Sequence, residues 1–197
     1  MKYGKFPWIM KSIAIFTTAA TGLLFLASQN WQASWLLVCA ISFGTTAYHF
    51  VMRLAVGYLL PKLTDYDFDY RHVWFQPRKW EPVFYKKLQV RKWKGKLPTY
   101  SPNQFSLEYQ SLYRIIQNMC GAELVHEIIV VFSFLPLLAV PLWGEFWVFL
   151  ITSALAALFD SIFVVAQRYN RPRLNPNDTS MYTILGKVHF HILSILL

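Results

Sequence analysis

Four long apolar runs constrain the fold of this chain more than any other feature of its sequence. They cover residues 9–27, 35–60, 121–142 and 146–166. A transmembrane helix needs about 20 predominantly apolar residues, and each run is close to that length or longer. Aromatic residues make up 18% of the chain, and many flank the runs, as they do at membrane interfaces. We therefore predict an all-α integral membrane bundle of four transmembrane helices, forming a single membrane domain over residues 1–197.

The first run follows a basic N-terminus, residues 1–11, a combination that also occurs in signal peptides. Because the polar link at 28–34 is very short, an uncleaved first span is favoured over a cleaved leader. Proline marks two further features. Pro61 is expected to end the second span and Pro136 to kink the third, because proline lacks the N–H that a helix interior uses.

Basic residues are distributed unevenly among the loops. The links at 28–34 and 143–145 carry no Lys or Arg, whereas the N-terminus, the middle segment 61–119 and the tail 167–197 carry almost all of them. The positive-inside rule then places both termini and the middle segment in the cytoplasm, so we expect a multi-pass protein of the cell membrane. The net charge of +9 favours anionic lipid headgroups or an anionic cosubstrate as partners, and beside four spans it argues against nucleic acid.

Residues 85–98 of the middle segment alternate bases with apolar and aromatic residues. This pattern is typical of an amphipathic segment on an anionic leaflet, where each Lys or Arg contributes about 1 kcal/mol. Some of the same bases could instead bind a phosphorylated donor, and both interpretations can hold together. Pro77 and Pro82 bracket a predicted turn, and residues 108–118 are predicted to be helical and to lead into the third span.

Three ionisable residues stand at the mouth of the third span. Glu123, His126 and Glu127 are spaced i, i+3 and i+4, which places them on one face of a helix. A charge at the centre of a membrane costs at least about 2.5–3.5 kcal/mol, so such residues need partners or a function. A histidine beside a carboxylate can deprotonate a hydroxyl while the carboxylate sets its tautomer. A structural hydrogen-bonded pair, and a Glu127 that faces the headgroups, are the alternatives.

The second span carries a similar group. Thr46, His49 and Arg53 fall on one helix face at i, i+3 and i+7, which predicts a functional site. A snorkelling Arg53 and a hydrogen-bonded structural His49 are the alternative. Asp160, the only charge in the fourth span, is either a site residue or a polar contact between helices.

Three arginines stand at the end of the fourth span. They belong to the arginine block, Gln167-Arg168-Tyr169-Asn170-Arg171-Pro172-Arg173-Leu174. Guanidinium groups suit phosphate or a developing oxyanion, although a cytoplasmic anchor is the alternative. Because the mouths of spans two, three and four open to one side, we expect this block, the Glu123–Glu127 face, His49 and Arg53 to meet in one cytoplasm-facing pocket.

Missing motifs narrow the chemistry. Cys39 and Cys120 lack the spacing of a disulfide framework or a metal site, so no metal is expected. The sequence has no Gly-x-Ser-x-Gly elbow and no Gly-rich nucleotide loop. Direct attack of an activated hydroxyl on an ester or thioester is therefore favoured over a covalent enzyme intermediate or nicotinamide chemistry.

Three blocks of the chain resemble a known family. They are Arg91-Lys92-Trp93-Lys94-x-Lys96, Ala122-Glu123-Leu124-x-His126 leading to Leu135-Pro136, and the arginine block. Together they resemble blocks of the glycosyl-4,4'-diaponeurosporenoate acyltransferases, small membrane enzymes of carotenoid pigment (staphyloxanthin) synthesis in Gram-positive bacteria. The resemblance covers roughly residues 85–174 and implies esterification of a fatty acyl group onto the glucose C6 hydroxyl of a glycosylated carotenoid. Asp160 stands where asparagine is expected in the family.

The residues and the resemblance together predict a membrane acyltransferase for a glycosylated carotenoid or related glycolipid, with acyl-CoA as cosubstrate and no other cofactor. The predicted catalytic residues are His126 as general base, Glu123 as its orienting partner, and His49. The predicted substrate-binding residues are Arg53, Glu127, Arg168, Tyr169, Asn170, Arg171, Arg173, Trp93 and Lys94. Among these, the three arginines of the block would hold the donor phosphates, and Arg53 with His49 would polarise the thioester carbonyl. A small membrane methyltransferase acting on a lipid, and a non-enzymatic scaffold, are the alternatives.

Overall fold

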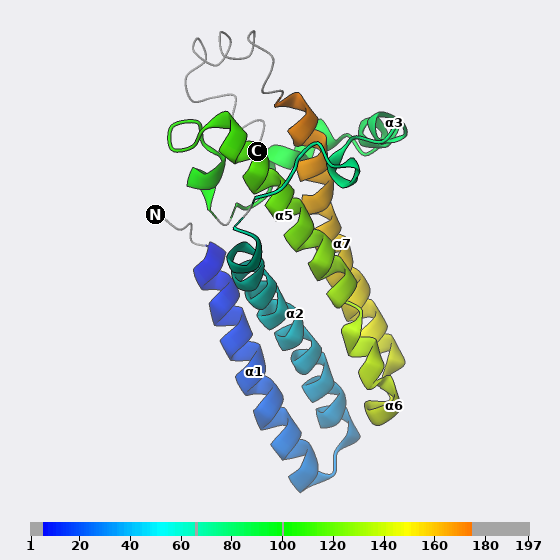
Figure 1. The fold of residues 1–197 in the computed structure, drawn as a ribbon. Helices are drawn as coiled ribbons and strands as arrows, with labels where there is room; N and C mark the ends of the chain where they lie inside the picture. The colour runs from blue at the N-terminus through cyan, green and yellow to red at the C-terminus, as the bar shows by residue number, and fades with distance from the viewer. Residues whose placement is uncertain (1–5, 66, 100, 175–197) are drawn as a thin grey trace. The chain divides into compact units, whose positions relative to one another are not determined.

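The structure is a computed structural model that describes residues 6–65, 67–99 and 101–174. Within these ranges the chain forms helices and no strands (Figure 1). Residues 1–5 and the tail from residue 175 onward lie outside them, so the predicted cytoplasmic position of both termini stays a prediction.

Among the described residues, four helical stretches are long enough and apolar enough to cross a membrane. They are Phe6–Trp31, Ser34–Thr64, Leu112–Trp143 and Phe146–Arg173. Many of their large apolar side chains are exposed, for example Ile15, Leu23 and Leu155. Exposing this much apolar surface to water is unfavourable, whereas the same surface is well suited to contact with the acyl chains of a membrane. The predicted fold class, an all-α architecture with four spans, is confirmed.

The described residues form two compact units. Unit 1 consists of residues 61–126 and 162–174, and unit 2 of residues 6–60 and 127–161. Unit 1 therefore holds the basic middle segment and the arginine block, while unit 2 holds most of the apolar helical residues. The prediction that residues 1–197 form one domain stays a prediction.

In unit 2, helix α1 (Phe6–Trp31) packs beside the first part of α2 (Ser34–Thr64). The two helices approach closely at Gly44, where an added Cβ would lie 3.2 Å from Thr21 Cγ2. Phe16 and Phe43 pack edge to face in the same pair of helices, with ring centres 6.2 Å apart. Small residues at such contacts let helix backbones approach in a membrane, where packing drives association.

The third span is broken near its middle. Helix α5 (Leu112–Phe132) is followed by a 3₁₀ turn, η4 (Leu135–Ala139), and by the short α6 (Val140–Trp143). Pro136 has no N–H to donate to the carbonyl of Phe132 four residues earlier. That carbonyl instead accepts a hydrogen bond from Tyr48 Oη at 2.8 Å. The kink predicted at Pro136 is therefore confirmed as a break, and its orphaned acceptor is satisfied within unit 2.

The end predicted for the second span is wrong. Helix α2 continues through Pro61 to Thr64, because a proline so close to the C-terminus removes only one backbone hydrogen bond. The helix ends where Asp65 adopts a left-handed φ of 49°. The N–H of Asp65 donates to the carbonyl of Pro61 at 3.0 Å, which caps the last turn.

Other boundaries also differ from prediction. Helix α1 extends beyond the predicted 9–27 at both ends. The helix predicted at 108–118 begins only at Leu112, since residues 108–111 are not helical, but it continues into the third span, so α5 starts well before the predicted Gly121. Helix α7 (Phe146–Asn170) extends beyond the predicted end at Ala166. The polar residues added at both ends find partners inside unit 1. On α5, Gln117 Oε1 accepts from the N–H of Phe68 at 2.6 Å and Asn118 Nδ2 donates to the carbonyl of Gln104 at 2.7 Å. The partners of Arg168 and Asn170 on α7 are described below.

The middle segment folds into short helical turns rather than one long helix. In chain order they are η1 (Val73–Phe75), α3 (Glu81–Lys87), α4 (Val90–Trp93), η2 (Lys94–Lys96) and η3 (Pro102–Phe105). The turn predicted between Pro77 and Pro82 is present at residues 79–80, and α3 begins directly after it.

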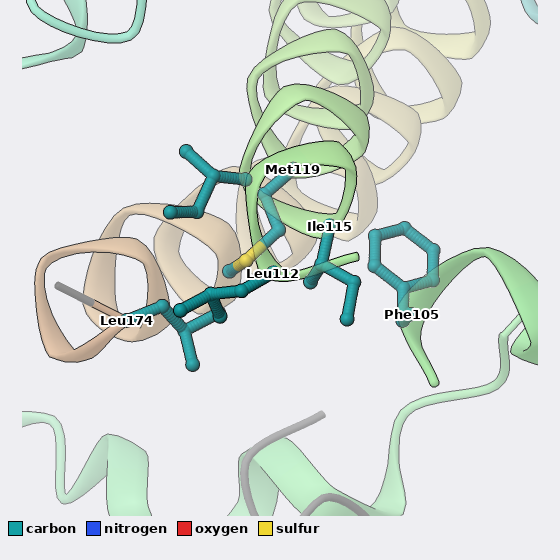
Figure 2. Close-up of a cluster of buried hydrophobic side chains, with 6 residues drawn as sticks. Phe105, Leu112, Ile115, Met119 and Leu174 are labelled. Carbon is teal, nitrogen blue, oxygen red and sulfur yellow. The ribbon is translucent and has the colours of Figure 1, made fainter. Parts of the chain in front are cut away.

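A small apolar core holds unit 1 together (Figure 2). It consists of Phe105, Leu112, Ile115, Ile116, Met119 and Leu174. Four of these residues lie in the first turns of α5, and Leu174 is the last residue of the arginine block. Full burial of one such side chain contributes about 1.5–3 kcal/mol, so Leu174 holds the end of the arginine block against α5.

Candidate active site

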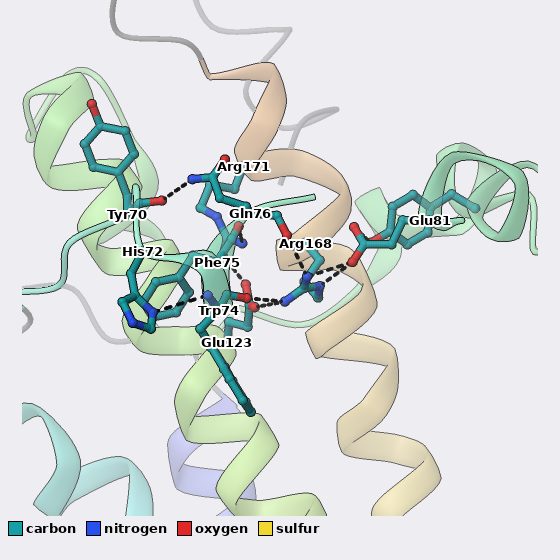
Figure 3. Close-up of polar contacts among 10 residues, drawn as sticks. Tyr70, His72, Trp74, Phe75, Gln76, Glu81, Glu123, Arg168 and Arg171 are labelled. Carbon is teal, nitrogen blue, oxygen red and sulfur yellow. Dashed lines mark hydrogen bonds and ion pairs between the residues drawn. The ribbon is translucent and has the colours of Figure 1, made fainter. Parts of the chain in front are cut away.

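Glu123 is the centre of a buried ion-pair network in unit 1 (Figure 3). Its side chain, on α5, is 0% exposed. Oε1 accepts a hydrogen bond from Arg168 Nη1 at 2.7 Å, and Oε2 pairs with Arg171 Nη1. Arg168 belongs to α7, and Arg171 opens η5 (Arg171–Arg173). One carboxylate thus joins two arginines of the arginine block.

Arg168 also binds a second carboxylate, that of Glu81 at the start of α3. Nε and Nη2 of Arg168 donate to Glu81 Oε1 at 2.9 and 2.7 Å. Its Nη1 and Nη2 also reach the carbonyls of Trp74 and Gln76, at 3.0 and 3.1 Å. Glu81 is 2% exposed, and its Oε2 accepts from Tyr85 Oη at 3.0 Å. Burial and this bond to Glu81 raise the pKa of Tyr85 well above its ordinary value, so the phenol remains a donor.

Arg171 adds the third element to the network. Its Nη2 donates to the carbonyl of Phe75, and its guanidinium carbon lies 5.1 Å from the centre of the Phe75 ring. Together, Arg168 and Arg171 fasten η1 and the residues after it to α5 and α7. Two carboxylates and two guanidinium groups give the network, Glu81–Arg168–Glu123–Arg171, a formal charge of zero. Such neutrality is what makes the burial of four ionised groups tolerable.

The three arginines of the block are therefore not equivalent. The N–H groups of Arg168 and Arg171 bind carboxylates and carbonyls of the protein itself, which favours a positioning role. Arg173 instead donates to the carbonyl of Tyr169, and its guanidinium carbon lies 3.5 Å from the centre of the Tyr169 ring. Among the described residues it makes no ion pair. Phosphate binding by these arginines stays a prediction, and Arg173 is the one whose charge is uncompensated.

Lys94 brings two of the predicted blocks together. It is 3% exposed, and its Nζ lies 2.6 Å from Asn170 Oδ1 on α7. The same amine lies 5.2 Å from the centre of the Tyr169 ring. Burial, together with repulsion from Arg173 and Arg91, lowers the pKa of Lys94 to about 8. The neighbouring Trp93 donates its indole N–H to the carbonyl of Leu88 at 3.0 Å.

Raising the pH is expected to stabilise the protein through Lys94. In the folded chain the pKa of this amine is about 8, against an ordinary 10.5, so between these values the unfolded chain binds more protons. Stability contributed by Lys94 therefore rises with pH across that window. Thermal unfolding is measured for the wild type and for Lys94→Met at several pH values. As the pH rises from about 8 to 10.5, the Tm of the wild type should increase relative to the Tm of the variant. A difference that does not change with pH would contradict this expectation.

His126 lies one helical turn beyond Glu123 on α5. Its imidazole stacks on the ring of Phe163 from α7, with centres 4.7 Å apart and planes inclined by 11°. The side chain is half-buried, as is that of Glu127. Stacking holds the imidazole plane and leaves the two nitrogens along the ring edge. The catalytic role of His126, its orientation by Glu123, and substrate binding by Glu127 stay predictions.

Arg53 of the second span forms an ion pair with Asp160 of the fourth span, within unit 2. Arg53 donates from Nε and Nη2 to Asp160 Oδ2, at 2.8 and 2.5 Å. It also donates to the carbonyls of His49 and Ala156, at 2.9 and 3.0 Å. Arg53 therefore does not snorkel, and Asp160 is a polar contact between helices. The prediction that His49 and Arg53 share a pocket with the arginine block stays a prediction.

His49 is buried beside this ion pair, with 4% of its surface exposed. Neither ring nitrogen has a hydrogen-bond partner among the described residues, and the same is true of Ser153 Oγ. Neighbouring hydroxyls behave differently: Thr152 Oγ1, for example, donates to the carbonyl of Val148 at 2.7 Å. The alternative, a structural His49 held by hydrogen bonds, therefore finds no support among the described residues. A catalytic role for His49 stays a prediction.

Asp160→Asn is expected to destabilise the protein by about 3–5 kcal/mol, because it leaves the buried guanidinium of Arg53 without its counter-charge. Adding Arg53→Met to the same chain should recover most of that loss, since the unpaired charge is then removed. Thermal unfolding in detergent measures both variants. If the double variant is no more stable than Asp160→Asn alone, the stability of this region does not depend on the Arg53–Asp160 ion pair.

Sequence reasoning missed four contributors to the site: Glu81, Tyr85, Phe75 and Phe163. Glu81 is the only acidic residue between Asp69 and Glu108, in a strongly basic segment. A lone carboxylate among bases could have marked it as an internal counter-ion. Phe75 contributes its ring and its backbone carbonyl, and no sequence signal predicts the latter.

Comparison with known proteins bears on the same part of the chain. No curated protein and no solved structure matches it. The sequence model of one family, glycosyl-4,4'-diaponeurosporenoate acyltransferase, matches residues 71–176, more than half of the 197 residues. The match includes the whole ion-pair network together with Lys94, His126 and Arg173. On this evidence the chain belongs to the glycosyl-4,4'-diaponeurosporenoate acyltransferase family.

Proposed function

We propose that this protein esterifies a fatty acyl group onto a sugar hydroxyl of a glycosylated carotenoid, or of a related glycolipid, with acyl-CoA as donor. The observation that carries the proposal is the family match over residues 71–176, which contains the network and the polar residues packed around it. The four apolar helical stretches support it as well, because a carotenoid needs apolar surroundings.

In this proposal His126 activates the acceptor. The imidazole takes the proton from the sugar hydroxyl as the hydroxyl oxygen attacks the thioester carbonyl. When the carbon–sulfur bond breaks, the imidazolium returns that proton to the sulfur, and coenzyme A leaves as the thiol while the ester forms. The stack on Phe163 fixes the ring plane, so that a nitrogen at the ring edge can be held toward a hydroxyl. Such positioning is a large part of what a protein contributes to a reaction between two bound substrates.

The ion-pair network would act by positioning rather than by contact with substrate. Glu123 lies one turn from His126, and its two arginines hold α5 against α7. His126 is on α5 and Phe163 is on α7, so the network maintains the pair of helices that carries the stacked rings. Arg173, near the end of the arginine block, and Lys94, which contacts Asn170 of that block, would contribute positive charge toward the donor.

The test is an assay with purified protein in lipid nanodiscs. Glycosyl-4,4'-diaponeurosporenoate and palmitoyl-CoA are supplied together, and mass spectrometry follows the appearance of the acylated carotenoid. Empty nanodiscs and reactions without the donor are the controls. A parallel reaction with S-adenosylmethionine tests the methyltransferase alternative. Formation of the ester only with protein and acyl-CoA supports the proposal, whereas a methylated product or no product at all contradicts it.

A further inference from the structure

A pocket of about 500 Å³ opens in unit 1 beside the arginine block. Its walls include Tyr85, Lys86, Arg91, Tyr169 and Arg173, contributed by α3, α4, the end of α7 and η5. This volume falls within the range of small-molecule sites, about 300–1,000 Å³. The two tyrosine rings meet edge to face, with centres 5.5 Å apart, and give the pocket an aromatic wall.

The charges around the pocket are unbalanced. Lys86, Arg91 and Arg173 come from three separate helical turns, and none makes an ion pair with another described residue. The one acidic residue in the walls is Glu81, whose two oxygens already accept from Arg168 and Tyr85. Like charges that converge without a counter-charge repel one another, and a bound anion would relieve that repulsion.

The pKa of the buried Lys94 amine is affected by two of the same positive charges. Arg173 and Arg91 both contribute, after burial, to lowering the pKa of this neighbouring amine to about 8. The position of Arg173 is also well defined. Its guanidinium stacks on Tyr169 and donates to the carbonyl of that residue, while the next residue, Leu174, is buried in the core of unit 1. One cation of the pocket is therefore preorganised.

We propose that this pocket binds a phosphate-bearing ligand through Lys86, Arg91 and Arg173. Arginine forks match the geometry of phosphate oxygens, and lysine adds a point charge. Phosphate could be supplied by the nucleotide portion of an acyl donor or by the headgroup of an anionic lipid. The identification with the acyl donor rests on the proposed function, whereas binding of phosphate does not.

Binding is tested with the full-length protein in phosphatidylcholine nanodiscs, using coenzyme A and 3',5'-ADP as soluble probes. The triple variant Lys86→Gln, Arg91→Gln, Arg173→Gln is compared with Lys79→Gln, Lys92→Gln, Lys96→Gln, which removes the same charge from exposed residues outside the pocket. We expect the pocket variant to raise the Kd at least about tenfold, and the control variant to change it little. A second arm measures transfer of detergent-solubilised protein to nanodiscs containing phosphatidylglycerol.

Pocket-dependent binding of coenzyme A and 3',5'-ADP identifies the soluble donor as the source of phosphate. Pocket-dependent preference for phosphatidylglycerol without binding of either nucleotide identifies the lipid headgroup. Equal losses in the two triple variants, or no binding to any probe, overturn the proposal. Failure of the proposed function would look different: nucleotide binding would depend on the pocket, yet no acyl ester would form in the nanodisc assay.

Discussion

Replacing His126 by alanine is expected to lower the rate of acyl transfer by about 100- to 10,000-fold, the usual contribution of a positioned general base. In the proposed reaction, without the imidazole, the sugar hydroxyl must lose its proton to water while it attacks the thioester. The stacking contact with Phe163 is lost as well, but the side chain is half-buried and lies outside the ion-pair network, so the fold should survive. Initial rates of ester formation in nanodiscs measure the effect.

Two comparisons make the His126 experiment specific. The first comparison is His72→Asn, which changes another histidine of unit 1. In the wild type, His72 Nδ1 accepts a hydrogen bond from the backbone N–H of Trp74 at 3.2 Å, and the asparagine side chain keeps an acceptor for that N–H. We expect the rate of this variant to stay near that of the wild type. His126→Phe keeps a ring to stack on Phe163 but removes the base, and its rate should fall as far as that of the alanine variant. A folded His126→Ala protein with full activity would exclude the base assignment.

Glu123→Gln is expected to destabilise the protein by about 3–5 kcal/mol, the cost of breaking a buried ion pair by removing one partner. The substitution leaves Arg168 paired with Glu81 and removes the carboxylate that pairs with Arg171, so the network acquires a net buried positive charge. Two arginines then lose the acceptor that joins α5 to the arginine block. Thermal unfolding should show a lower Tm, and activity should fall because the helices that carry His126 and Phe163 are no longer held together.

The matched control is Glu108→Gln, which removes the same charge from an exposed carboxylate of unit 1 and should change Tm little. Combining Glu123→Gln with Arg171→Met restores neutrality in the network. If the network is a charge-balanced unit, the double variant should recover part of the lost stability, giving a non-additive cycle. Strict additivity of the two substitutions would show that Glu123 and Arg171 act independently.

The membrane architecture followed from local properties of the sequence. Length and hydrophobicity identified the four spans, and proline chemistry identified the break near Pro136, because both depend on residues close in the chain. The boundary errors in the third and fourth spans share one cause. At Leu112 and Asn170 the helices extend into polar sequence, and hydrophobicity alone cannot predict this because the stabilising partners come from distant segments.

The sequence by itself identified Glu123, His126 and the arginine block as candidate site residues, because ionisable residues at the ends of apolar spans stand out wherever they fall in the fold. Only the tertiary structure decided what each arginine does. Arg168 and Arg171 are neutralised by Glu81 and Glu123, while Arg173 keeps its charge at the rim of a pocket. The physical reason is that the sequence of a segment shows which charged side chains it carries. Whether each charge is neutralised depends on carboxylates and carbonyls that come from distant segments and that only folding brings close.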